Sequence, residues 1–207
     1  LSDFADMQAI YTDPISGSFS KFELFEHPPN GQGATAILLA NILRKFPLSS
    51  MDPFGFKRTH IETEATKLAY NARNRLVSDQ SVFDATSKMT SNKLAVELAA
   101  KISMNGVIDQ VTPITEEVHK DTIYITVVDK DRMSVSLIYS IFHGFGSGIA
   151  SEKFGVLFQN RGAGFNLISG HVNEYGAKKR PLHTIIPAIV KENGLIKMPF
   201  GVMGGQY

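Results

Sequence analysis

The sequence predicts an α+β fold in which helices dominate the first 120 residues and strands dominate the rest. Three helical patterns, the longest of them over Pro53–Asp79, lie before residue 105. After residue 121 the chain turns to alternating, β-branched segments that are joined by polar or Gly-containing turns. Helices and strands that are segregated along the chain in this way are typical of α+β domains.

The first 47 residues predict a turn, a strand, a breaker and a helix. Pro14–Gly17 favours a turn, and the alternation over Phe22–His27 favours a strand. Pro28–Gly33 contains two prolines and two glycines, so it should interrupt regular structure. Apolar residues at i, i+3 and i+4 spacing then predict a helix around Ala36–Leu43, which Pro47 ends.

Pro53–Asp79 has the clearest helical periodicity in the chain. Its apolar residues recur on one face, which marks the face that should pack on the core. They are Ile61, Ala65, Leu68, Ala69, Ala72 and Leu76. A third helix is predicted over Ser91–Ile102, and the polar, aperiodic Asn105–Lys120 predicts a loop or linker.

A β-hairpin is predicted directly after this linker. Thr122–Asp129 and Met133–Ser140 alternate in polarity around the polar turn Lys130–Arg132. Gly155–Asn160 predicts a further short strand, between loops rich in glycine.

The end of the chain predicts a second hairpin. Ile185–Val190 and Leu195–Val202 flank Glu192–Gly194, whose Asn-Gly pair is a strong hairpin signal.

Composition excludes several classes of function. The net charge is +1 and the basic residues are scattered, which gives no electrostatic case for nucleic acid or an anionic membrane. There is no cysteine and no apolar run near the roughly 20 residues that span a bilayer. The six histidines lack metal-ligand spacing, so no metal or other cofactor is expected. Residue 1 is Leu, so the chain is interpreted as a piece of a longer one; the compartment stays open, with the cytoplasm favoured.

Thr122, at the start of the first hairpin, has two interpretations. It fits a pleated strand, because threonine is common there. It can also be a nucleophile if the chain is cut between Asp121 and Thr122. The new α-amine, with a pKa of about 7.7–8.0, would then accept the hydroxyl proton.

Two further features would complete a site for acyl transfer. Folding the hairpin about its turn brings Ile141 and Ser140 opposite Thr122 and Ile123, which places Ser140 within hydrogen-bonding reach of Thr122. Gly204 and Gly205 follow the last predicted strand, and their adjacent backbone N–H groups suit an oxyanion.

A series of sequence blocks, in order along the chain, resembles the γ-glutamyltransferase family, also called glutathione hydrolases. The blocks are Asp3–Ala5 with Pro14–Gly17, Pro28–Gly33, Glu64–Arg73, Thr122–Asp129, Phe145–Gly148, Lys179–Leu182 and Gly204–Gly205. These enzymes are N-terminal-nucleophile hydrolases. The resemblance implies part of a four-layer αββα sandwich, without a cofactor, and autocatalytic cleavage of an inactive precursor between Asp121 and Thr122.

The resemblance also implies roles for residues. Thr122 would be the nucleophile that forms an acyl-enzyme, Ser140 would support it, and Gly204 and Gly205 would form the oxyanion hole. The implied function is that of a self-processing amidohydrolase or acyltransferase that cleaves γ-glutamyl amides such as glutathione. The donor would be a small-molecule amide, and the acceptor would be water or an amine.

By this resemblance residues 1–121 match the C-terminal part of a large subunit, and residues 122–207 match the N-terminal part of a small subunit. The two are expected to form one structural domain. The remainder of both subunits is expected as a partner, whereas nucleic acid and membrane are not.

Departures from the family pattern fall at positions that would bind the donor. Phe142 replaces a common Asn, Arg161 replaces a Gln, Gly164 replaces the Asp that pairs with the donor α-ammonium, and His183–Thr184 replaces Ser-Ser. The stretch around His183 resembles the branch that includes cephalosporin-type acylases. Two alternatives therefore stay open: an acylase of the same fold for another N-acyl amide, or a catalytically silent homologue that binds a ligand or partner.

Overall fold

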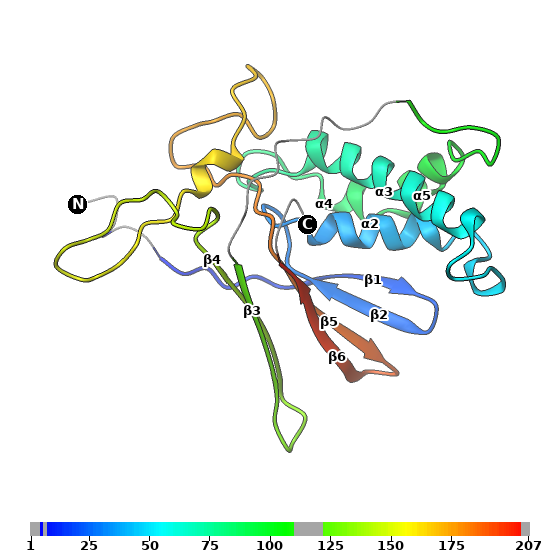
Figure 1. Ribbon diagram of the computed structural model, residues 1–207, viewed down its shortest axis with the longest axis horizontal. Coiled ribbons are helices and arrows are strands. Elements are labelled where there is room, and N and C mark those ends of the chain that lie inside the picture. The colour runs from blue at the N-terminus through cyan, green and yellow to red at the C-terminus, as the bar shows by residue number, and fades with distance from the viewer. Residues whose placement is uncertain (1–4, 6–7, 110–121, 204–207) are drawn as a thin grey trace.

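A computed structural model describes residues 5, 8–109 and 122–203 of the chain (Figure 1). The strands are β1 (Ile15–Phe19), β2 (Phe22–Glu26), β3 (Thr122–Val128), β4 (Ser134–Ser140), β5 (Ile186–Glu192) and β6 (Leu195–Val202). The α-helices are α2 (Gly33–Leu43), α3 (Phe56–Leu76), α4 (Thr86–Met89) and α5 (Asn92–Ala99). Two short 3₁₀ helices, η1 (Leu48–Ser50) and η2 (Arg161–Gly164), complete the elements within the described residues.

The strands form one sheet of four and one hairpin. The four-stranded sheet has the order β1-β2-β5-β6, with antiparallel neighbours throughout, and β3 pairs with β4 alone. The larger sheet therefore combines strands from both regions of the chain, because β2 of the first region pairs with β5 of the second. The helices gather on one side of this sheet, and the β3–β4 hairpin extends beside β5 and β6 (Figure 1).

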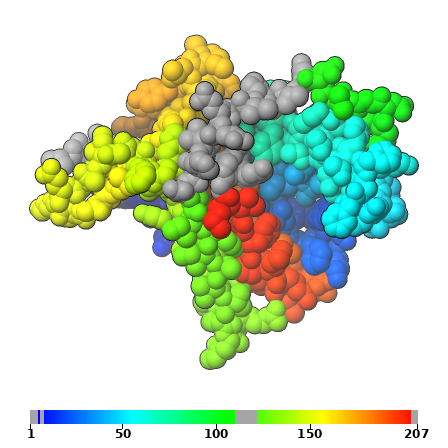
Figure 2. Space-filling model, viewed as in Figure 1, coloured from blue at the N-terminus to red at the C-terminus, as the bar shows by residue number. Residues whose placement is uncertain are grey.

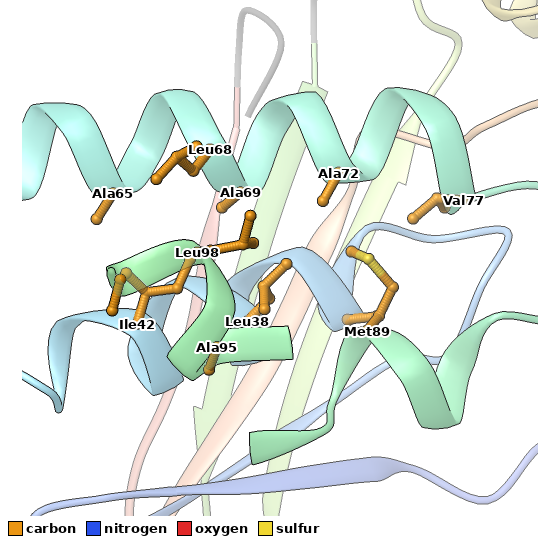
Figure 3. Packing of buried hydrophobic residues seen from close by; sticks show 12 residues of the cluster. Leu38, Ile42, Ala65, Leu68, Ala69, Ala72, Val77, Met89, Ala95 and Leu98 are labelled. Carbon is orange, nitrogen blue, oxygen red and sulfur yellow. The ribbon is translucent and has the colours of Figure 1, made fainter. Parts of the chain in front are cut away.

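The main core lies among the helices. Small residues of α3 face α2 and α5 and let the helices approach closely, while Met89 of α4 fills one end (Figure 3). The cluster is Ala34, Leu38, Ile42, Ala65, Leu68, Ala69, Ala72, Val77, Met89, Ala95, Leu98 and Ala99. The predicted apolar face of α3 is confirmed, since its residues are buried or pack partly buried on this cluster.

α2 also packs closely on β1. A Cβ atom added to Gly17 would lie 2.6 Å from Ile37 Cγ2, so only glycine fits there without a shift. The turn predicted over Pro14–Gly17 is wrong, because these residues enter β1, which pairs with β2 and lies under α2. β1 and β2 form a tight hairpin with Phe19 opposite Phe22, so the turn lies at Ser20 and Lys21, after the residues for which it is predicted.

Other boundaries differ from the prediction in smaller ways. α3 is shorter than Pro53–Asp79, because Gly55 is extended before it and Val77 is extended after it. α5 begins after Ser91, whose hydroxyl accepts a hydrogen bond from the Leu94 N–H and caps the helix. The strand predicted over Gly155–Asn160 is wrong, since the segment contributes only the isolated bridge Ala150–Leu157 to the described structure.

The α+β class is confirmed, whereas the four-layer sandwich stays a prediction for this chain. One face of the hairpin exposes apolar side chains, and the hairpin lies beside β6 on the molecular surface (Figure 2). These side chains are Ile123, Ile125, Val127, Val135, Leu137 and Tyr139. None of the helices in the described ranges has the length and apolar character to cross a membrane.

Candidate active site

Thr122 and Ser140 lie directly opposite each other at the open end of the β3–β4 hairpin. The ladder runs in register from this pair down to Val128 and Ser134. The hairpin is confirmed, but its register is shifted by one residue from the prediction, because Thr122 pairs with Ser140 and not with Ile141. Thr122 Oγ1 and Ser140 Oγ are 2.9 Å apart and share a hydrogen bond. Both side chains are half-buried, so two hydroxyl groups meet where the hairpin joins the rest of the molecule.

Arg161, the first residue of η2, contacts this pair through its guanidinium group. Its Nη2 donates to Ser140 Oγ over 2.9 Å, and its Nη1 donates to Thr184 Oγ1 over 2.9 Å. The side chain is only 6% exposed, and the guanidinium carbon lies 4.3 Å from the centroid of the Phe142 ring. The guanidinium is therefore held from three sides by Ser140, Thr184 and Phe142.

The charge of Arg161 has no acidic partner in the described part of the chain. No carboxylate there lies within ion-pair distance of its guanidinium. Burial lowers the pKa of Arg161 to about 10, so the group still carries its proton at neutral pH. A buried cation consequently lies beside the two hydroxyl groups.

Phe142 completes the group with its backbone and its ring. Its N–H donates to Ser140 Oγ over 3.0 Å. The residue has φ of 77°, in the left-handed region that bulky side chains rarely adopt, and it is 6% exposed. The ring stacks on His143 at 4.7 Å and lies under Arg161. These contacts hold a strained backbone whose N–H points at Ser140.

Gly164 lies where a side chain does not fit. A Cβ atom at this position would be 2.9 Å from the Leu182 carbonyl oxygen. Asn173 holds the two segments together, since its Nδ2 donates to the Gly164 carbonyl and its Oδ1 accepts from the Leu182 N–H. Any side chain at position 164, aspartate included, would therefore require the backbone at Leu182 to shift.

His183 and Thr184 are tied to the Pro28–Gly33 segment. The His183 N–H donates to the Asn30 carbonyl over 2.9 Å, and Gln32 Nε2 donates to the Thr184 carbonyl over 2.8 Å. Burial, together with the nearby charges of Arg161 and His27, lowers the pKa of His183 to about 3. His183 is therefore neutral at physiological pH and adds no second cation to the site.

Residues 1–207 match the family described as gamma-glutamyltranspeptidase over their whole length. The chain belongs to this family. It is 31% identical over 207 residues to the "Glutathione hydrolase-like YwrD proenzyme" of Bacillus subtilis, covering 100% of this chain and 39% of that protein. It is 29% identical to the glutathione hydrolase proenzyme of Escherichia coli, covering 98% of this chain and 38% of the relative.

Other relatives of this gamma-glutamyltranspeptidase-family chain carry different names. The oxamate amidohydrolase proenzyme of Klebsiella pneumoniae is 29% identical, with 99% of this chain and 38% of that protein covered. The crystal structure of cephalosporin acylase from Bacillus halodurans is similar with a TM-score of 0.86 and 31% identity, covering 99% of this chain and 37% of that one. The chain thus spans about two fifths of the length of these family members.

Five of the residues that the sequence singles out form one hydrogen-bonded and stacked group in this family member. They are Thr122, Ser140, Phe142, Arg161 and Thr184. His183 adjoins this group, and Gly164 closes η2 against Leu182. Asp121, Gly204 and Gly205 lie outside the described residues, so the processing bond and the oxyanion donors stay predictions.

Gln32 is a residue of this region that the sequence does not single out. Besides Thr184, it contacts Arg73, whose Nη1 donates to Gln32 Oε1 over 2.9 Å. Arg73 is 4% exposed although it carries a charge. The proline and glycine residues of Pro28–Gly33 indicate only an interruption of regular structure. They do not indicate that Gln32 contacts residues 41 and 152 positions away in the sequence.

Proposed function

We propose that Thr122 is the nucleophile of a self-processing amidohydrolase or acyltransferase. The observation that carries the proposal is the 2.9 Å hydrogen bond between Thr122 Oγ1 and Ser140 Oγ at the end of the hairpin. Membership of the gamma-glutamyltranspeptidase family supports it, and the names of several relatives describe proenzymes. The whole activity is a proposal for the complete protein, of which this chain represents part.

Processing comes first in the proposed mechanism. Thr122 Oγ1 attacks the carbonyl carbon of Asp121, the peptide C–N bond breaks, and the new ester is hydrolysed by water. The products are the Asp121 carboxyl group and a free α-amine on Thr122. That amine then serves as the base, since an N-terminal amine accepts a proton near neutral pH.

Turnover repeats this chemistry on a small-molecule amide. Thr122 Oγ1 attacks the carbonyl carbon and its proton passes to the α-amine. The tetrahedral intermediate collapses, the proton moves to the leaving nitrogen, and an acyl-Thr122 ester remains. Water or an amine then attacks the ester, which releases the acid or a new amide and restores the hydroxyl. Gly204 and Gly205 are proposed to donate backbone N–H groups to the oxyanion, with no cofactor.

The family favours γ-glutamyl amides, glutathione included, as the donor. A second candidate is an N-acyl amide that lacks the α-ammonium group, and two observations favour it. The buried cation of Arg161 would repel an ammonium group beside it. Gly164 leaves no space for a carboxylate that could pair with that ammonium. Relatives named cephalosporin acylase and oxamate amidohydrolase fit a family in which the acyl group varies.

Intact-mass analysis of the complete protein tests the nucleophile. We expect two polypeptides, the second beginning at Thr122, and an acyl adduct on it after brief incubation with an activated donor. Thr122→Ala should remain uncut and unacylated. Thr126→Ala is the matched control, because Thr126 faces Ser136 in the same ladder and should be processed normally. An uncut wild-type chain without an adduct would point instead to the catalytically silent homologue.

A matched pair of chromogenic amides tests the donor. γ-Glutamyl-p-nitroanilide and glutaryl-p-nitroanilide differ only in the α-amino group. If Arg161 and Gly164 set the preference, kcat/KM is higher for the glutaryl compound. A clear preference for the γ-glutamyl compound would contradict this second candidate and favour γ-glutamyl amides as the donor.

A further inference from the structure

The hydroxyl of Ser140 has three hydrogen-bond partners in the described structure. They are Thr122 Oγ1 at 2.9 Å, Arg161 Nη2 at 2.9 Å and the Phe142 N–H at 3.0 Å. A serine hydroxyl offers one donor and two acceptor positions, so these three contacts use its full capacity.

Two of the three partners can only donate. A guanidinium group has no acceptor, and a backbone N–H has none either. Arg161 and Phe142 therefore occupy both acceptor positions of Ser140 Oγ. The single proton of Ser140 has one direction left, which is toward Thr122 Oγ1.

We propose that Arg161 is a positioning residue that fixes the direction of the Ser140–Thr122 hydrogen bond, with Ser140 as donor and Thr122 Oγ1 as acceptor. This inference rests on the proposed role of Thr122 as nucleophile. It goes further, because it states which hydroxyl carries the shared proton and which residue decides that.

The direction matters for the reaction. If Thr122 donated to Ser140, that hydrogen bond would have to break before the Thr122 proton could move to the α-amine. With Ser140 as donor, the Thr122 proton is free for the amine. The Ser140 O–H also strengthens its contact as negative charge develops on Thr122 Oγ1, so it acts mainly in the transition state.

The surroundings of Arg161 hold its guanidinium group in this orientation. Thr184 Oγ1 accepts from the second nitrogen, Nη1, and the Phe142 ring lies under the plane at 4.3 Å. A neutral Gln at position 161 would carry an acceptor oxygen as well as a donor nitrogen, so it could leave the direction open. An arginine at position 161 can only donate, so Ser140 Oγ must accept from it.

A double-mutant cycle in the complete, processed protein tests the inference. Arg161→Met removes the donor while keeping an unbranched side chain, and Ser140→Ala removes the hydroxyl through which Arg161 acts. With the glutaryl compound as donor, which lacks the ammonium group that Arg161 would repel, we expect each single variant to lower kcat for acyl-enzyme formation by roughly tenfold or more, with little change in KM. Because both act through one hydrogen bond, the double variant should lose no more than Ser140→Ala alone.

The controls separate direction from charge and from folding. Arg132→Met removes an exposed arginine on the hairpin turn and should leave kcat unchanged. Arg161→Lys keeps a donor-only cation and should retain more activity than Arg161→Gln. Should Arg161→Met fail to fold, Lys and Gln variants replace it in the cycle, with the Lys advantage expected to vanish in the Ser140→Ala background.

Losses that multiply in the double variant would overturn the inference, because Arg161 would then act independently of Ser140. Neutron diffraction gives a direct reading: deuterium on Ser140 pointing to Thr122 supports the assigned direction, and deuterium on Thr122 pointing to Ser140 refutes it. Failure of the proposed function would give a different result. If the Thr122→Ala variant still turned over the donor, Thr122 would not be the nucleophile.

Discussion

Phe142 shows at the scale of one residue how strain and contact are balanced beside the candidate nucleophile. Its φ of 77° is unfavourable for a side chain with a Cβ atom, and order-of-magnitude costs of such conformations are about 1–2 kcal/mol. The contacts with Arg161 and His143 stabilise it in return. The strained backbone aims the Phe142 N–H at Ser140.

Two substitutions at Phe142 separate the strain from the ring. Phe142→Ala and Phe142→Gly both remove the aromatic contacts, but only glycine adopts a positive φ without cost. We expect Phe142→Gly to unfold with a free energy about 1 kcal/mol higher than Phe142→Ala, measured by urea denaturation of the complete protein. Equal stability of the two variants would show that the backbone there is not strained.

Glu26 is a second residue to consider, because the burial of its carboxyl group should make the stability of the protein depend on pH. It is 2% exposed, neither carboxyl oxygen has a hydrogen-bond partner among the described residues, and burial raises its pKa to about 8. In the unfolded chain the group ionises near its ordinary value of 4.5. The folded state therefore binds more protons between these values, and stability falls as pH rises from about 4.5 to about 8.

Glu26→Gln should remove this pH dependence. Relative to the wild type, the variant should gain stability as the pH is raised from 5 to 8, measured by urea denaturation at each pH. Glu23→Gln, on the exposed face of the same strand, is the matched control for the amide substitution itself. A constant difference between Glu26→Gln and wild type across this range would contradict the buried, protonated state.

At the scale of elements, the packing of α2 on β1 depends on one missing side chain. Gly17 faces Ile37, and an added Cβ would lie 2.6 Å from its Cγ2 atom. The close approach lets a five-residue strand reach the helical core. The ladder with β2 forms the strand, and the missing side chain at Gly17 lets α2 pack directly on it.

Gly17→Ala should therefore destabilise the protein by about 1–3 kcal/mol, the usual effect of overpacking a core. In an Ile37→Ala background the same Gly17→Ala exchange should cost less than in the wild type, because the atoms that the new methyl group meets are gone. Gly106→Ala is the control, since a Cβ there meets nothing within 4 Å. Thermal unfolding compares the variants, and an unshifted midpoint for Gly17→Ala would exclude the close contact.

Periodicity explains which parts of the fold could be predicted. The face of α3 and the existence of the β3–β4 hairpin follow from repeats of 3.6 and 2 residues. The pairing of Thr122 with Ser140 differs by one residue from the predicted register, because alternation does not fix how many residues the turn takes. Arg161 could not be connected to Ser140 and Thr184 in this way, because it lies in irregular structure 21 and 23 positions from them. Its role depends on how loops fold over one another, and only the family resemblance marks its position.

At the scale of the whole molecule, the four-stranded sheet joins the two regions of the chain. β2 pairs with β5 over five residues, and Asn30 and Gln32 hydrogen-bond to the segment that contains His183 and Thr184. In sequence the proposed cut between residues 121 and 122 falls between the two partners of each of these contacts, so the contacts would link the two polypeptides. We therefore propose that residues 1–121 and 122–207 form one structural unit together with the remainder of both subunits.

Processed protein should accordingly keep both polypeptides together. We expect them to elute as one species in size-exclusion chromatography and native mass spectrometry, and to separate only in denaturant. The apolar face of the hairpin predicts in addition that residues 122–207 made alone aggregate. Polypeptides that separate in native buffer after processing would show that the ladder between β2 and β5 does not hold them.

The crowding of Gly164 by Leu182 has a consequence for how enzymes of this kind can change. An aspartate at position 164 would meet the Leu182 carbonyl oxygen rather than open space, so the proposed donor preference would depend on the path of the backbone and not only on one side chain. The Asn173 side chain holds Gly164 and Leu182 in place, since it donates to the Gly164 carbonyl and accepts from the Leu182 N–H. Evolution or engineering toward a charged amino-acid donor must first shift residues 181–184, and a single exchange at Gly164 is expected to yield an unstable intermediate rather than a new specificity.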